Sequence, residues 1–576
     1  MKLVTSKQIR EIDRVAIKDY GIPSISLMTK ASEHIAKAAL EHIPAGGSAV
    51  AFCGTGNNGG DGIGAAAFLL QKGIPVRVFI IGDINNLTPD TAEMQKRFKA
   101  FGGSIEPFAM SFDLDNQINN CNVIIDAIFG IGLNSVLQGD ALSAVSVINS
   151  SRATVISADI PSGVHADTGA ILGDAVKADL TVTFSLAKPG HFVEPGCIYC
   201  GELRVCDIGV PQEALNRVVS HIYSASPKDL HLPRRKQDSH KGDYGRALII
   251  AGSIGYTGAP ALSARAASKM GAGLVSLGVP SSIYDIMAVK LDEEMPFPLP
   301  DDENGHISSN SASEILQRAR KSDVCLIGPG LGVSDGISEL VESIIRIANT
   351  PLVLDADGLN AIAKNPDILN QTTCPLVLTP HPGEFERLGG KLSNEDLFDN
   401  GSGVNLNTEE DDDGFEIDES VFDDDIFDDN TYDEIMHAQM SDWTSPIEIG
   451  QKPAGQQRTK LTPVDRLRAA RDFASKYGCI LVLKGHRTIV ALPNGIAYVN
   501  TTGGPAMAKG GTGDVLAGMI TALIAQKLPI VHAVATAVYL HGLAGDICAD
   551  KFGEYCVTAT DIIDMLPQAI KEIETI

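Results

Sequence analysis

The segment 48–81, SAVAFCGTGNNGGDGIGAAAFLLQKGIPVRVFII, constrains the fold of this chain most strongly. It contains a short apolar stretch, a Gly/Asn turn, an Ala-rich stretch and a second apolar run. This order predicts a strand, a helix and another strand, in which the two strands lie parallel in one sheet. Ligands of such sheets bind beyond the carboxyl ends of the strands. The segment therefore predicts a parallel α/β domain with a site near the turn.

Polar side chains follow the next predicted strands at the same relative position. NVIIDAIFGIGL places Asp126 at a strand end, and TVISADIPSGV places Asp159 and Ser162 at another. Together with Asn58 of the first turn, they offer amide, carboxylate and hydroxyl oxygens, which suit a hard cation. Any one of these acids alone would be a cap or turn residue, but the set indicates a site. Lys188 follows a further strand and is predicted to be a solvated surface lysine, with contact to a phosphate as the alternative.

A second α/β series begins after a polar junction. Residues 212–238 are polar and contain Pro227 and Pro233, which favours a domain boundary there. Several later apolar stretches again end in Gly turns or polar residues, so a second parallel sheet is expected. The polar residues at these predicted strand ends are Asp355, Asp357, His381, Glu384, Lys484 and Thr488.

The segment Asn500 to Gly518, NTTGGPAMAKGGTGDVLAG, ends this series with six glycines and Asp514 ahead of an apolar helical run. A Gly-rich turn that opens a helix presents backbone N–H groups to a phosphate. A carboxylate at such a site indicates that Asp514 handles a proton or a metal-bound phosphate. The alternative for Asp514 is a capping residue.

The formal net charge of −26 comes mostly from one region. Nineteen acidic residues and no Lys or Arg lie between 394 and 442, and the other 53 acids face 46 bases, which leaves about −7. Neither value favours nucleic-acid binding, which needs a basic face. The acidic segment 394–458 is predicted to be a disordered insertion in the second domain. A partner-binding role for its interspersed aromatic residues is the alternative.

The N-terminal residues are charged and amphipathic, without the apolar stretch of a signal peptide, and no run of eighteen apolar residues occurs. The ten cysteines are sparse and scattered. Cys197 and Cys200 form a CxxC without a second pair, which predicts neither a zinc site nor a redox site. A cytoplasmic protein with reduced thiols and no membrane span is expected, with two or three domains for 576 residues.

MKLVTSKQIREIDRVAIKDYGIPSISLM, GNNGGDG, IIDAIFGIGL and ADIPSGV together resemble the epimerase half of the NAD(P)H-hydrate repair enzymes. The resemblance covers 1–212 and implies a Rossmann-like three-layer domain that inverts C6 of the hydrated nicotinamide ring. It implies that Asp159 contacts the substrate, and Asp159 is the carboxylate we expect to transfer the proton. Thr29 and Ser32 depart from the family pattern. The remaining implied residues are Asn57, Asn58, Gly59, Gly60, Asp61, Gly130, Ile131, Gly132, Leu133, Asn134, Ser135 and Val136 for the substrate, and Asn58, Asp126 and Ser162 for K+.

GPGLG, TPHPGEFERL, LVLKGHRT and TTGGPAMAKGGTGDVLAG similarly resemble the dehydratase half of the same enzymes, which has a ribokinase-like fold. The resemblance implies a domain over 239–576, after a linker at 213–238, that uses ADP with Mg2+. Asp514 would accept the proton of the C6 hydroxyl while the hydroxyl attacks phosphorus. The implied contacts are Ala259, Pro260, Gly332, His381 and Asp514 for the hydrate, and Lys484, Gly485, His486, Arg487, Thr488 and Gly513 for ADP.

The resemblance of both halves implies an enzyme that interconverts the R and S hydrates of NADH and NADPH and dehydrates the S form, giving AMP and phosphate. Two alternatives remain at this point. One is a ribokinase-like kinase of a hydroxymethyl group with a fused ligand-binding domain, and the other is a scaffold that docks through the acidic insertion. A homo-oligomer is expected, with small molecules as the principal ligands.

Overall fold

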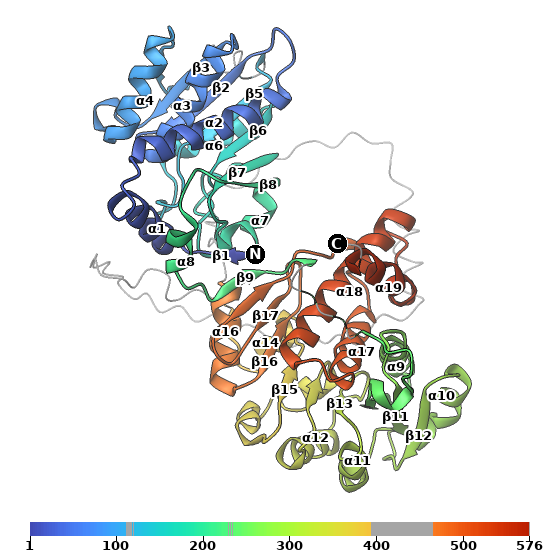
Figure 1. Cartoon of the computed structure of the whole chain (residues 1–576). Coiled ribbons are helices and arrows are strands. Elements are labelled where there is room, and N and C mark those ends of the chain that lie inside the picture. The colour runs from blue at the N-terminus through green and yellow to red at the C-terminus, as the bar shows by residue number, and fades with distance from the viewer. Residues whose placement is uncertain are drawn as a thin grey trace, which may run out of the picture. The chain divides into compact units, whose positions relative to one another are not determined.

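The computed structural model of this chain describes residues 1–110, 118, 120–227, 230, 232, 234–392 and 465–574. The predicted insertion 394–458 lies outside the described residues. Within the described part, the chain forms two α/β domains with largely parallel sheets, as predicted (Figure 1).

The first sheet has seven parallel strands in the order β4-β3-β2-β5-β6-β7-β8. The strands are β2 (Ala49–Gly54), β3 (Val76–Ile81), β4 (Ile105–Pro107), β5 (Val123–Ala127), β6 (Thr154–Ala158), β7 (Leu180–Phe184) and β8 (Glu202–Cys206). The helices of this half are α1 (Ser6–Lys18), α2 (Ser24–His42), α3 (Asn57–Gln71), α4 (Pro89–Ala100), α6 (Gly139–Ser150), α7 (Gly196–Tyr199) and α8 (Gln212–Arg217).

Both faces of this sheet are covered, which explains why strand β2 near its centre is apolar throughout rather than alternating. Ala51 and Cys53 of β2 belong to the core shared with α1–α4, whereas Val50 and Phe52 belong to the core shared with α6. Successive side chains of a strand point to opposite faces, so a strand between two helical layers needs apolar residues at every position. The result is the three-layer domain predicted from the sequence.

The second sheet has eleven strands in the order β1-β9-β18-β17-β16-β15-β14-β13-β10-β11-β12. The seven strands from β16 to β12 pair in parallel, whereas β16-β17 and β17-β18 pair antiparallel. The strands are β1 (Lys2–Leu3), β9 (Ile222–Ser224), β10 (Arg246–Ile250), β11 (Leu274–Pro280), β12 (Met295–Leu299), β13 (Val324–Ile327), β14 (Leu352–Leu354), β15 (Leu376–Leu378), β16 (Ile480–Leu483), β17 (Ile489–Ala491) and β18 (Ala497–Val499).

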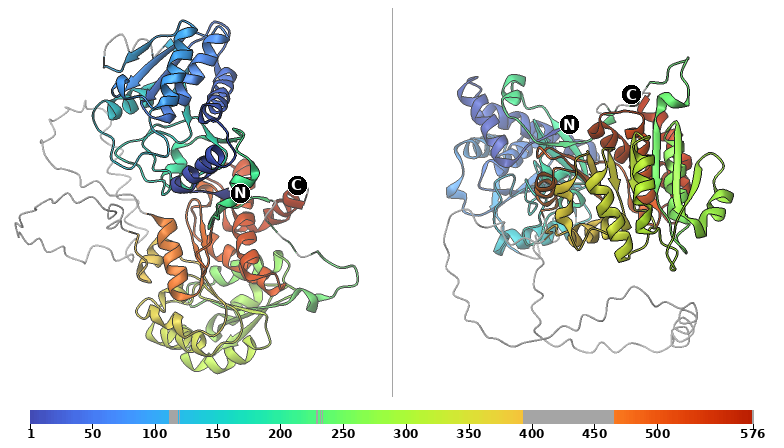
Figure 2. Two further views of the ribbon diagram at one scale, coloured as in Figure 1. Left: turned by 60° about the vertical axis from the view of Figure 1, so that its left-hand side comes forward. Right: turned by 90° about the horizontal axis from the view of Figure 1, so that it is seen from below.

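Helices also cover both faces of the second sheet, as the two further views in Figure 2 show by the separation of α17–α19 from α11 and α12. One core contains residues of α11, α12, α14 and α16, and the other contains residues of α9, α10 and α17–α19. Their bounds are α9 (Gly258–Lys269), α10 (Tyr284–Lys290), α11 (Ala312–Ala319), α12 (Asp335–Ile347), α13 (Asp357–Asn360), α14 (Pro382–Arg387), α16 (Arg466–Tyr477), α17 (Thr512–Ala525), α18 (Ile530–Phe552) and α19 (Ala559–Glu574).

The junction 213–238 contributes structure of its own. It contains β9, which pairs in parallel with β18, and the first strand of the chain, β1, pairs antiparallel with β9. The Met1 amino group also donates a hydrogen bond to the Ser224 carbonyl at 2.7 Å. The start of the chain therefore completes the edge of the second sheet, which the sequence patterns do not predict.

Helix α18 is long and apolar enough to cross a membrane, and it is the one such helix in the described part of the chain. Its apolar residues Ala533, Val534, Ala537 and Leu540 are buried in the core of the second domain, where α18 packs against α17 and α19. This environment is that of a core helix.

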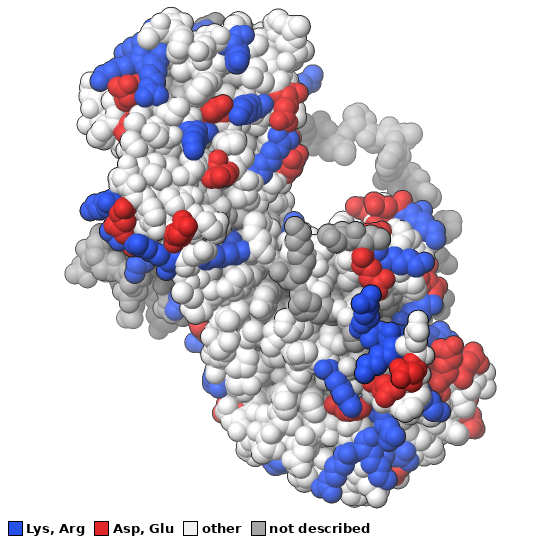
Figure 3. All heavy atoms as spheres, viewed as in Figure 1, with Lys and Arg blue, Asp and Glu red and all other residues white. Residues whose placement is uncertain are grey.

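The charged surface of the described residues is mixed. On the face shown in Figure 3, Lys and Arg side chains alternate with Asp and Glu over both domains. The acidic excess calculated from the sequence lies in 394–442, which is outside the described residues.

Candidate active sites

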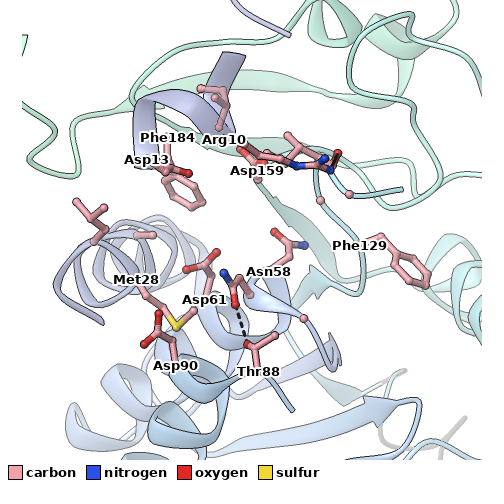
Figure 4. A pocket seen from close by; sticks show the side chains of 18 of the residues that line it. Arg10, Asp13, Met28, Asn58, Asp61, Thr88, Asp90, Phe129, Asp159 and Phe184 are labelled. Carbon is pink, nitrogen blue, oxygen red and sulfur yellow. Dashed lines mark hydrogen bonds between the residues drawn. The ribbon is translucent and has the colours of Figure 1, made fainter. Parts of the chain in front are cut away.

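A cavity of about 590 Å³ lies at the carboxyl ends of β2, β5, β6 and β7, against α1 and α2 (Figure 4). Helix α3 begins at this edge because Gly56 and the following Asn-Asn-Gly-Gly residues turn the chain directly out of β2. Several residues predicted to bind the substrate line this cavity, and they come from three separate stretches of sequence. They are Asn57, Asn58, Asp61, Gly130, Ile131, Gly132, Leu133 and Asp159.

Asp159 forms a buried ion pair with Lys188 in this cavity. The Lys188 ammonium lies 2.5 Å from Asp159 Oδ1, and Lys188 and the Thr183 hydroxyl both donate to this carboxylate. Burial alone would raise the pKa of Asp159, but the Lys188 charge and its hydrogen bond hold this pKa below its usual value. Asp159 is therefore a carboxylate that stays ionised.

The prediction for Lys188 was wrong. Its side chain is 1% exposed, and its ammonium donates to Asp159 and to Thr183 Oγ1. The sequence shows a lysine after a strand but not the carboxylate at the end of the neighbouring strand that draws it inward. The backbone of Asp159 also has a positive φ of 65°, which is uncommon for a residue other than glycine and typical of functional sites.

Asp126 and Ser162 form a second polar cluster just below the cavity. Asp126 is fully buried and accepts hydrogen bonds from Ser162 Oγ at 2.6 Å, Ser162 N at 2.9 Å and Ser157 Oγ at 2.8 Å. Burial raises the pKa of Asp126, against these hydrogen bonds. The Ser162 hydroxyl also accepts from Phe129 N at 2.9 Å. Gly130, which follows Phe129 in the chain, packs against Asn58, because a Cβ added to Gly130 would lie 3.0 Å from Asn58 Oδ1. Oxygens of all three predicted cation ligands are thus gathered at one end of the sheet.

The other predicted residues of this half do not line the cavity. Gly59 and Gly60 are buried inside α3, where a Cβ on Gly59 would lie 1.8 Å from the Gly54 carbonyl oxygen. These glycines permit close packing of α3 on its neighbours. Asn134, Ser135 and Val136 extend beyond the lining residues. Thr29 accepts from Arg97 and Ser32 is fully buried, so neither departure from the family pattern reaches the cavity.

Asp13 is a cavity residue that the sequence patterns did not single out. It projects from α1 between the buried residues Ile9, Ile12 and Ala16. The sequence offered one indication that Asp13 is functional, which is its position as an acid within the apolar face of an amphipathic helix. Burial raises the pKa of Asp13 to about 6.

The second candidate site gathers residues from two strand ends and two helices. Lys484 follows β16 and lies 2.8 Å from Asp355 Oδ1, after β14, and 3.7 Å from Glu384 Oε2, in α14. A Cβ on Gly513 would stand 3.3 Å from Lys484 Nζ, so the ammonium also reaches the first turn of α17. Burial would lower the pKa of Lys484, but the carboxylates of Asp355 and Glu384 raise it, which keeps Lys484 charged.

Asp514 lies in this first turn of α17. The turn is possible because Gly511, just before the helix, has φ of 91°. Burial, followed by the negative charge of Asp355, raises the pKa of Asp514 to about 7, against the effect of Lys484. No described residue forms a hydrogen bond with the Asp514 carboxylate. A carboxyl group with this pKa can accept a proton near neutral pH.

The predicted hydrate contacts surround two glycine-rich turns. The Gly332 N–H donates to Asp357 Oδ2 at 2.9 Å. Gly330 packs against Ala259, because a Cβ added to Gly330 would lie 3.2 Å from Ala259 Cβ. Pro260 packs against Gly252, because a Cβ added to Gly252 would lie 3.0 Å from the Pro260 ring.

His381 caps α14, with Nδ1 accepting from Gly383 N at 3.1 Å and Glu384 N at 3.3 Å. Its side chain is 50% exposed. Burial lowers the pKa of His381, which favours the neutral imidazole that these two N–H donors require.

The predicted nucleotide residues point in different directions. Lys484 faces the carboxylates, whereas the His486 ring contacts Glu194 Oε1 at 3.0 Å and Arg487 donates to the Thr501 carbonyl at 2.7 Å. The Thr488 hydroxyl donates to the Gly485 carbonyl at 2.9 Å and closes the turn. Arg487 has φ of 58°, so this turn also contains an uncommon backbone conformation.

The two domains thus have the architecture of ligand-binding α/β enzymes, each with its charged residues at the carboxyl edge of a parallel sheet. Comparison with known proteins gives the family. Residues 24–190 match the family model of the YjeF-related protein N-terminus, and residues 247–409 and 456–568 match that of the NAD(P)H-hydrate dehydratase.

Full-length relatives carry both halves. The bifunctional NAD(P)H-hydrate repair enzyme of Moorella thermoacetica is 34% identical over all of this chain and 97% of its own. The enzyme of the same name from Thermofilum pendens is also 34% identical, with the same coverage. A crystal structure of the ADP/ATP-dependent NAD(P)H-hydrate dehydratase of Bacillus subtilis, co-crystallised with ATP and Mg2+, is 26% identical over 61% of this chain and 98% of its own, with a TM-score of 0.42. This chain belongs to the family of bifunctional NAD(P)H-hydrate repair enzymes.

Proposed function

We propose that the first domain interconverts the R and S forms of hydrated NADH and NADPH at C6, and that the second domain dehydrates the S form with ADP. The observation that carries this proposal is the agreement between the family and the second site, where Lys484 lies close to the Gly-rich first turn of α17 that contains Asp514. Epimerisation supplies the form that the dehydratase accepts, so one chain can repair both hydrates.

Dehydration needs the C6 hydroxyl to leave, and hydroxide is a poor leaving group. Asp514 accepts the hydroxyl proton as the oxygen attacks the terminal phosphorus of ADP, and phosphate then departs from C6. N–H groups at the start of α17 stabilise the negative charge on the transferred phosphoryl group. Lys484 offsets part of that charge. Its ion pairs with Asp355 and Glu384 also fix the position of the turn 484–488 that follows β16.

The carboxylates around Lys484 fit a Mg2+ ion that is held mainly by the phosphates of the nucleotide, since Mg2+ in such sites takes one or two protein carboxylates. Asp355, Asp357 and Glu384 are the described residues that would offer these oxygens. When bound, the ion neutralises phosphate charge.

In the first domain, Asn58, Asp126 and Ser162 would hold K+. Their oxygens are of the neutral and anionic kinds that a hard cation prefers. The ion would fix the strand ends that carry the substrate loop 130–133. Cytoplasmic location, a homo-oligomer and a partner for the acidic insertion stay predictions.

The test follows reduced nicotinamide absorbance after each purified hydrate epimer is mixed with the full chain, ADP and Mg2+. We expect recovery from both epimers with the native chain, and loss of most turnover with unchanged ADP affinity in Asp514→Asn. Glu554→Gln, an exposed acid of the same domain, is the control and should keep full turnover. Normal dehydration by Asp514→Asn would refute the role of this carboxylate, and no recovery from either epimer would refute the function.

A further inference from the structure

The first cavity contains more carboxyl groups than the Asp159–Lys188 pair explains. Asp13 of α1 and Asp61 of α3 also line it, and Figure 4 shows Asp13, Asp61 and Asp159 around the same space. Within the described part of the chain, neither Asp13 nor Asp61 has a hydrogen-bond partner for its carboxylate. Both residues are partly buried, and acids in a cavity that lack partners are candidates for ligand contacts.

Two further polar atoms in this cavity lack partners. Asn58 Nδ2 and Ser185 Oγ are buried and form no hydrogen bond with any described residue, and both residues line the cavity. Ser185 also has φ of 60°. A buried amide and a buried hydroxyl without partners are costly, so these atoms independently indicate that a polar ligand occupies the cavity.

We propose that Asp13 is the proton donor of the epimerisation and that Asp159 is its base. This inference rests on the function proposed for the first domain. It assigns the two proton-transfer roles to two carboxyl groups whose surroundings differ in one respect, the presence of an ammonium group.

The surroundings determine which carboxyl carries the proton. Lys188 keeps Asp159 ionised, whereas no cation forms an ion pair with Asp13 among the described residues. Burial raises the pKa of Asp13 to about 6, opposed by the charge of Lys188 and assisted by that of Asp159. An acid with a pKa near the working pH both gives and regains its proton readily. The titratable and charged residues lining the cavity are Arg10, Asp13, Asp61, Asp90, Asp159 and Lys188.

Asp61 is the third carboxyl group of the cavity. Burial, followed by the charges of Asp159 and Asp13, raises the pKa of Asp61 well above its usual value. A raised pKa favours the neutral carboxyl group, which can donate a hydrogen bond to the substrate. Asp61 is thus suited to orienting the substrate, and proton donation is assigned to Asp13.

The reaction proceeds through a planar C6. Asp13 transfers its proton to the C6 hydroxyl, the C–O bond breaks with its electron pair on oxygen, and water leaves while the ring nitrogen lone pair forms an iminium ion. Water then adds to the other face of C6 and gives its extra proton to Asp159. The product is the inverted hydrate, with Asp13 ionised and Asp159 protonated, and exchange with solvent restores both.

The experiment compares the full-length Asp13→Asn and Asp140→Asn variants. Asp140→Asn makes the same substitution at an exposed position of the first domain that does not line the cavity. R and S hydrates are separated by chromatography, and the spontaneous rate is subtracted. We expect Asp13→Asn to lower kcat about 10²–10⁴-fold with KM changed less than about threefold. Asp140→Asn should stay within about threefold of the native chain, and both variants should dehydrate the S form at the native rate.

The pH profile separates proton transfer from a structural role. Because the donor must be protonated, the native kcat/KM of epimerisation should fall as pH rises through about 6, and this fall should be absent in Asp13→Asn. Oxygen from ¹⁸O-labelled water should enter C6 once per inversion.

Native-like epimerisation by Asp13→Asn, a retained fall near pH 6 in that variant, or inversion without label uptake would each overturn this assignment. Absence of epimerisation by the native chain would instead refute the function proposed for the first domain.

Discussion

Replacement of Lys188 by methionine tests the buried ion pair of the first domain. Methionine has nearly the length of lysine but no charge, so the change removes the ammonium with little loss of packing. Lys188 is 1% exposed and contacts both Asp159 and Thr183. The variant leaves the Asp159 carboxylate, of which 11% is exposed, without its counter-ion.

Removal of one partner from a buried pair typically costs about 3–5 kcal/mol, and both groups here are buried enough for this range to apply. The effect depends on pH. In the native chain the pKa of Asp159 is lowered, so the pair stabilises the fold above the unfolded pKa of about 3.9 and the contribution is lost as pH falls through the folded value. In the variant, burial raises the pKa of Asp159. The loss of folding free energy is therefore largest at pH values above this raised pKa and becomes smaller toward pH 4.

Hydrogen exchange measured by mass spectrometry on peptides of β6 and β7 reports the opening free energy of the first domain alone. A domain-specific measurement is needed because a two-domain chain need not unfold in a single step. We expect a loss of about 3–5 kcal/mol at pH 8 and a smaller loss at pH 5. Lys177→Met, at an exposed position, should change this free energy by less than about 0.5 kcal/mol. The double variant Lys188→Met/Asp159→Asn should recover part of the loss. A loss below about 1 kcal/mol at pH 8, or one that does not shrink at pH 5, would refute the reasoning.

Two further predictions concern the charged residues of both sites. Because Asp514 must be ionised to accept a proton and its pKa is about 7, the kcat/KM of dehydration should rise as pH increases through about 7. Lys484→Met removes a charge that lowers this pKa, so the rise should move to higher pH and ADP should bind more weakly; an unchanged midpoint in the pH profile would contradict this. Asp126→Asn should abolish the stimulation of epimerisation by K+ over choline and leave dehydration unchanged, since Asp126 lies in the first domain only. Equal K+ dependence in the native chain and the variant would exclude a cation at Asp126.

The predicted sites could be located from the sequence because parallel sheets place strand ends at one edge. Asp159 and Asp514 both follow short apolar or Gly-rich stretches that indicate where the chain turns, and the structure places each in a polar site at such an edge. Lys188 and Asp13 could not be assigned in the same way. The environment of each residue is set by side chains of other helices and strands, and a single sequence does not show which elements become neighbours.

The sequence by itself determined the strand, turn and helix order around the first site and the family to which the motifs belong, since both depend on local patterns. Tertiary structure decided the protonation states. Lys188 keeps Asp159 ionised, whereas Asp13, partly buried in the same cavity, has no cation partner in the described structure, and burial raises its pKa to about 6. The physical reason is that a pKa depends on burial and on charges brought within a few ångströms by folding, and neither is encoded in a local stretch of residues.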